Sequence, residues 1–113
     1  MEDTMDEKIE KAITTAKARL PALTAHSDMQ KAGQAILNLM VTKATYAGFT
    51  KPTDELDEEI GFVLGKVRSN LGATDLQQVT QAAMHLMQAK AQIEELQPQQ
   101  GTKITKKQGA GAS

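Results

Sequence analysis

Four stretches of the chain place apolar residues at steps of three and four, which is the spacing that lines up one face of an α-helix. In the third stretch this series consists of Leu56, Ile60, Val63, Leu64, Val67 and Leu71. No stretch shows the clean alternation of apolar and polar residues that is typical of a half-buried strand. The pattern therefore predicts an all-α protein with four helices.

Residues that start or stop helices separate the four stretches. Pro21 disfavours a helical conformation in the residue before it, and Pro98 stops the fourth stretch. Gly48 is a natural stop for the second helix. Capping boxes beginning at Ser27 and Thr74 are expected to start the second and fourth helices. We therefore expect helices at about 4–20, 28–47, 53–71 and 75–97.

Helices of this length joined by short links favour a single-domain antiparallel four-helix bundle, expected here over residues 1–97. The link around Gly72 is only two or three residues long, which predicts that the third and fourth helices form an αα-hairpin. Residues 98–113 contain three lysines, no acidic residue and one large apolar residue, Ile104. They are expected to form a flexible, disordered basic tail.

Composition excludes several functional classes. The 113 residues include no cysteine, so disulfides, thiolate metal sites and cysteine catalysis are excluded. The 13 basic and 14 acidic residues nearly cancel, so we expect no nucleic-acid partner. No segment is apolar enough to span a membrane, and the N-terminus is acidic where a signal peptide is basic. We expect a cytoplasmic protein without a membrane partner.

Motifs for catalysis are absent from the sequence. It contains no phosphate-binding glycine loop, nucleophile elbow or zinc-binding His-Glu motif. A dimetal bundle needs a glutamate three residues before each histidine, but Leu23 precedes His26 and Ala82 precedes His85. We therefore predict no enzymatic activity, no metal site and no cofactor. The alternative is a metal- or cofactor-binding bundle that uses Met5 with His85, or clustered carboxylates.

An acidic run opens the third predicted helix. Its members are Asp54, Glu55, Asp57, Glu58 and Glu59. These carboxylates suit a solvated first turn, because the positive end of the helix dipole lies there. They also suit a hard cation or a basic partner, and both alternatives stay open.

Small and flexible residues suggest a contact surface. Gly61 and Gly65 lie four residues apart, and each glycine in a helix costs about 1 kcal/mol relative to alanine. We expect these glycines to let another helix approach closely, either within the chain or across a dimer. Methionines adapt to varied partners, although a methionine on a helical stripe also suits a core. The predicted contact residues are Gly61, Phe62, Gly65, Met84 and Met87. The two methionines, together with Met29 and Met40 of the second helix, are expected to form a groove for a partner helix if the faces of the second and fourth helices converge.

These observations favour one functional class. The sequence predicts a small helical protein–protein interaction or structural module without catalytic activity. Its expected partner is another protein or a second copy of itself.

Overall fold

Helices account for nearly all the regular structure of the chain. The computed structural model describes residues 4–51 and 53–96, so the tail predicted at 98–113 lies outside the described residues. The helices are α1 (Met5–Arg19), α2 (His26–Ala47), α3 (Asp57–Leu64) and α4 (Ala73–Leu96), with a short 3-10 turn, η1 (Leu20–Ala22), after α1. Within the described ranges there is no strand. The all-α, four-helix prediction is confirmed.

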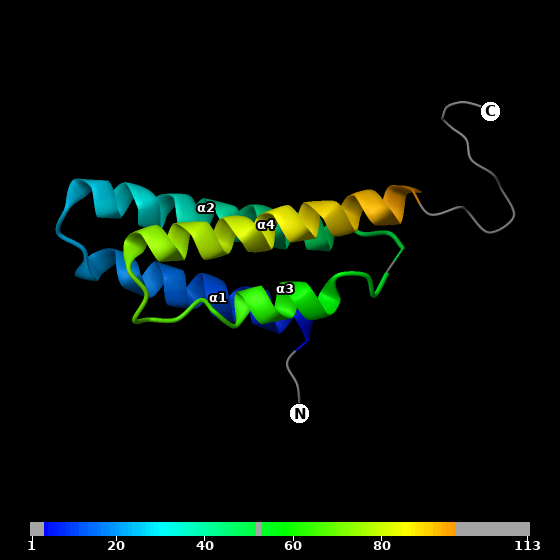
Figure 1. The fold of residues 1–113 in the computed structure, drawn as a ribbon, viewed down its shortest axis with the longest axis horizontal. Helices are drawn as coiled ribbons and strands as arrows, with labels where there is room; N and C mark the ends of the chain where they lie inside the picture. The colour runs from blue at the N-terminus through cyan, green and yellow to red at the C-terminus, as the bar shows by residue number, and fades with distance from the viewer. Residues whose placement is uncertain (1–3, 52, 97–113) are drawn as a thin grey trace, which may run out of the picture.

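Successive helices run in opposite directions, as an antiparallel bundle requires (Figure 1). The most extensive helix–helix contact nevertheless joins α2 and α4, which are two apart in the chain. These two run parallel, because Lys31 contacts Thr74 near one end and Lys51 contacts Glu94 near the other. α1 packs on α2 and α3 packs on α4, so the bundle has two layers of two helices.

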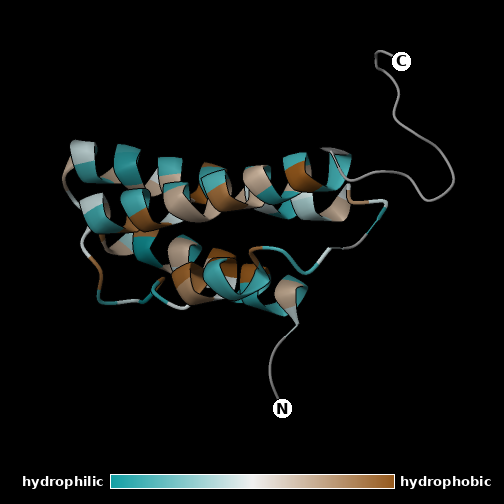
Figure 2. Ribbon diagram, turned by 45° about the vertical axis from the view of Figure 1, so that its right-hand side comes forward, coloured by the Kyte–Doolittle hydropathy of each residue, from teal (hydrophilic) through white to brown (hydrophobic). Residues whose placement is uncertain are grey.

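The core is built from one apolar face of each helix. Colouring by hydropathy shows polar and apolar residues alternating around each helix, as one-sided burial requires (Figure 2). The largest buried apolar side chains are Ile9, Ile13, Leu39, Ile60, Leu64, Leu76 and Met87. Buried alanines on α1, α2 and α4 let these helices approach closely. No helix among the described residues has the length and hydropathy needed to cross a membrane.

A buried polar layer joins α2 to α4. The Asn38 amide donates to the Thr80 hydroxyl at 3.2 Å and to the Gln77 carbonyl at 3.4 Å. Thr42 and Thr80 are also fully buried, and each hydroxyl donates to a carbonyl one turn earlier in its own helix. A polar layer of this kind favours one register, because sliding the helices leaves buried donors without acceptors.

The helix starts differ in part from the prediction. α1 begins with a capping box in which the Thr4 hydroxyl accepts from the Glu7 amide. α2 begins at His26 rather than with a Ser27 cap, because the Ala25 carbonyl already accepts from the Met29 amide. α4 begins at Ala73, and the Thr74 hydroxyl accepts from Lys31 of α2 at 2.8 Å.

The third helix is much shorter than the predicted 53–71. Its start is delayed because Leu56 has a φ of 67°, a left-handed conformation that a helix cannot continue through. Its end is fixed at Gly65, after which tight turns close at Lys66 and Val67. Val67 is still buried, so the apolar spacing continues in an irregular segment. The predicted αα-hairpin with a two- or three-residue link is therefore wrong, because residues 65–72 form the link.

Candidate functional site

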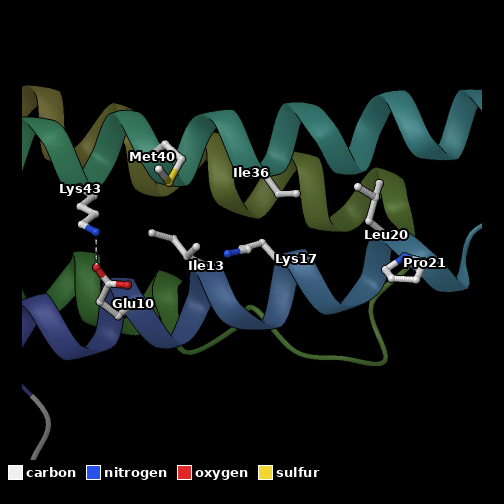
Figure 3. A pocket seen from close by; sticks show the side chains of 8 residues that line it. All are labelled: Glu10, Ile13, Lys17, Leu20, Pro21, Ile36, Met40 and Lys43. Atoms are coloured by element: carbon white, nitrogen blue, oxygen red, sulfur yellow. Dashed lines mark ion pairs between the residues drawn. The ribbon is translucent and has the colours of Figure 1, made fainter.

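A groove lies between α1 and α2 on the outside of the bundle (Figure 3). Its volume is about 620 Å³, within the range typical of ligand-binding pockets. The lining residues are Glu10, Ile13, Lys17, Leu20, Pro21, Ile36, Met40 and Lys43. Five of these eight side chains are apolar, the Glu10–Lys43 pair lies toward one end of the groove, and Lys17 extends beside Ile13 (Figure 3). The groove is therefore suited to an apolar side chain from another molecule.

One ion pair spans the groove. The Lys43 ammonium lies 2.6 Å from the Glu10 carboxylate, and both side chains are nearly half exposed. The hydrogen bond and charge of Glu10, with a further contribution from Asp6, raise the pKa of Lys43 above its ordinary value. Exposed pairs of this kind contribute little stability. This pair instead turns the positive charge of Lys43 toward α1 and away from the outside of α2.

The exposed residues of α2 include no Asp, Glu, Lys or Arg. We define the α2 outer face as the exposed residues of this helix: His26, Ser27, Met29, Gln30, Gly33, Gln34, Leu37, Met40, Ala44 and Ala47. Leu37 is 53% exposed and Met40 is 47% exposed. Apart from His26 at its first position, the α2 outer face has no ionisable side chain.

The charges of α2 are directed to its sides. Lys31 donates to Thr74 of α4, and Lys43 pairs with Glu10 of α1. The third charged residue, Asp28, is half-buried in the first turn, where a carboxylate complements the helix dipole. The uncharged outer face thus results from where the charges are placed as well as from the composition of the helix.

The predicted glycine contact lies partly inside the chain. A Cβ at Gly61 would stand 2.9 Å from the Lys8 ammonium, so this glycine gives room to a side chain of α1. Gly65 is exposed at the end of α3. Phe62 is 67% exposed, and the Lys66 ammonium lies 4.8 Å from its ring centre. The structure therefore uses Gly61 for a contact within the chain and leaves Phe62 on the surface.

The methionines do not converge on one groove. Met87 is fully buried in the core, so the prediction that it contacts a partner is wrong. Met84, on the same helix, is half-buried. Met29 and Met40 are exposed on the α2 outer face. The methionines of α2 are on its exposed side, whereas the stripe of α4 that contains Met87 faces the core.

The acidic run divides between surface and interior contacts. Asp54, Glu55, Glu58 and Glu59 are exposed at or before the first turn of α3. Asp57 instead lies 2.5 Å from the ammonium of Lys90 on α4. In the part of the chain that the structure describes, no group of three or more metal-ligating side chains is close enough to hold a metal ion.

Sequence reasoning missed the role of Lys90. Its side chain is 2% exposed, and its ammonium donates to the Thr53 and Glu55 carbonyls as well as to Asp57. The Phe49 ring centre lies 5.5 Å from the same nitrogen. The available signal was a lysine interrupting the apolar stripe of the fourth helix. The three N–H donors of the ammonium are matched by three acceptor groups, so Lys90 holds the segment before α3 against α4.

The residues of the cofactor alternative lie in different surroundings. Met5 packs against the hydrophobic core, whereas His85 is exposed on α4. His26 is exposed at the start of α2.

No protein-family model, curated protein or solved structure matches the chain. The functional argument therefore depends on the chain's own surface, where the α2 outer face, with the exposed apolar residues Met29, Leu37 and Met40, adjoins the groove between α1 and α2.

Proposed function

We propose that the protein is a non-catalytic helical module that binds another polypeptide helix through the α2 outer face and the groove between α1 and α2. The observation that carries this proposal is that the α2 outer face contains no Asp, Glu, Lys or Arg, because Lys31 and Lys43 make their contacts toward α4 and α1. A helix that faces only water usually carries charged residues on its outer side. Single exposed apolar residues are ordinary, but a continuous uncharged face along a whole helix is typical of an interface.

The spacing of the face suits a helical partner. Met29, Gly33, Leu37, Met40, Ala44 and Ala47 follow one another at steps of three and four. Helix-in-groove recognition uses anchor residues with this spacing. The long side chains provide apolar contact area, and the small residues between them let a partner backbone come close.

Affinity capture from native lysate, with mass measurement of the recovered complex, tests the proposal. Ala44→Glu places a charge on the α2 outer face, and its matched control is Ala82→Glu on the exposed side of α4. We expect the wild-type protein and the Ala82→Glu control to recover the same polypeptide, and Ala44→Glu to lose it. Equal recovery by both variants contradicts the proposed function, and so does a wild-type chain that neither recovers a polypeptide nor associates with itself.

A further inference from the structure

We infer that the polypeptide bound to the α2 outer face is a second copy of this chain, with the two α2 helices packed antiparallel about a twofold axis. This inference rests on the proposed function and names its partner.

Charge is the first argument for self-association. A twofold dimer sets a surface against itself, so any charge near the axis meets its own copy. The α2 outer face presents none, because Lys31 and Lys43 are turned toward α4 and α1. A partner helix with a strongly charged face meets no opposite charge on the α2 outer face itself, because the charged residues Glu10, Lys17 and Lys43 line the neighbouring groove. An uncharged face is therefore matched best by another uncharged face, and the chain supplies one.

The order of large and small residues is the second argument. In an antiparallel pair, the register that sets Met40 of one copy over Gly33 of the other also sets Met29 over Ala44. The same register places His26 near Ala47 and puts the twofold axis between Ile36 and Leu37. Met29 and Met40 then each meet a residue that leaves room for them, and the two copies of Leu37 lie beside each other at the axis.

Gly33 is the third argument. It lies inside α2, where glycine is a poor helix former, and no atom of the described residues lies within 4 Å of the place that a Cβ would take there. In residues 4–51 and 53–96, neither packing nor backbone conformation accounts for a glycine at this position, since its φ is not left-handed. A second helix crossing at this point does account for it, because a glycine lets the two backbones approach closely.

The size of the interface indicates a weak dimer. α2 has 22 residues and is therefore roughly 33 Å long. A contact confined to one helix pair of this length is expected to be small beside specific interfaces, which bury about 1,200–2,000 Å² in total. We expect a monomer–dimer equilibrium that shifts with concentration.

Sedimentation equilibrium of the full purified chain tests the inference. We expect the wild type to dimerise and Gly33→Leu to weaken the dimer by roughly ten-fold or more, because the added side chain occupies the space that Met40 needs. Gly33→Leu improves helix propensity, so its melting temperature is expected to stay unchanged or rise. Ala44→Glu is expected to weaken the dimer as well, and Ala82→Leu on α4 is the control that leaves it unchanged.

The possible results separate this inference from the proposed function. A wild-type chain that stays monomeric at every concentration overturns the inference. If that monomer still recovers a different polypeptide, and Ala44→Glu loses it, the proposed function stands. A dimer that neither Gly33→Leu nor Ala44→Glu weakens overturns the inference, and unchanged capture by Ala44→Glu then overturns the proposed function too.

Discussion

Replacing Lys90 by methionine removes the contact that fastens the segment before α3 to α4. Methionine keeps much of the apolar volume of lysine but has no donor. The carbonyls of Thr53 and Glu55 lose their contact with the ammonium, and Asp57 loses its ion pair. The change therefore tests whether this buried lysine holds the fold together.

The expected loss of stability follows from the burial of each partner. Removing one member of a fully buried ion pair costs about 3–5 kcal/mol. Asp57 is 41% exposed at its side chain, so water can replace part of what it loses. Each carbonyl left without a donor adds about 1–3 kcal/mol if it stays dry. A neighbouring cavity of about 360 Å³, lined in part by Thr53 and Asp57, has room for water. We expect a net loss of about 2–4 kcal/mol.

Thermal unfolding followed by far-UV circular dichroism measures this loss. For a domain of this size, each 1 kcal/mol shifts the melting temperature by about 4–8 °C. Lys90→Met is therefore expected to melt at least about 8 °C below the wild type. The matched control is Lys66→Met, because Lys66 is exposed and loses only its contact with the Phe62 ring, which is worth about 0.5–1 kcal/mol at an exposed site. If both variants melt together with the wild type, the Lys90 contact is not a stabilising one.

Three further predictions concern stability. Asn38→Ala removes buried hydrogen bonds between α2 and α4 and should lower the free energy of unfolding by about 1–3 kcal/mol in urea titrations; an unchanged midpoint contradicts this. Gly61→Ala should raise the melting temperature by a few degrees, because alanine gains about 1 kcal/mol of helix propensity and the new Cβ meets only the movable end of Lys8. A lower melting temperature would show that the Lys8 side chain cannot move away from the new Cβ. The folded-state pKa of Lys43 lies above its ordinary value of 10.5, so the stabilisation from Glu10 is fully present below that pH and is lost as pH rises through the raised pKa. The stability difference between the wild type and Lys43→Gln should therefore shrink in alkaline solution, and a difference that stays constant there refutes this assignment.

Sequence periodicity predicted the three long helices well because local signals bound them. α1 and α2 follow stripes that end at Pro21 and Gly48, and their observed ends lie within two residues of those expected. The predicted third helix was too long, because Val67 lies in an irregular segment but is buried and continues the apolar spacing of the helix. The left-handed conformation of Leu56 could not be predicted, because leucine is not a residue type that signals it.

The candidate site depends on contacts between helices, which periodicity does not provide. The stripes of α2 and α4 were visible, but their parallel contact was not, because it joins residues about forty positions apart. Lys90 appeared only as an interruption of a stripe, since its partners precede it by more than thirty residues. The uncharged α2 outer face could be recognised only after Lys31 and Lys43 were seen to point sideways.

Disulfide cross-linking tests the central claim most directly. The chain has no cysteine of its own, so a single introduced cysteine reports one position. Leu37 lies beside the expected twofold axis, so Leu37→Cys should form a covalent dimer on mild oxidation, because disulfides join Cα atoms less than about 7 Å apart. Ala82→Cys, on the exposed side of α4, should stay largely monomeric at the same concentration. Equal cross-linking at both positions, or none at Leu37→Cys, contradicts the account that two copies meet through the α2 outer face.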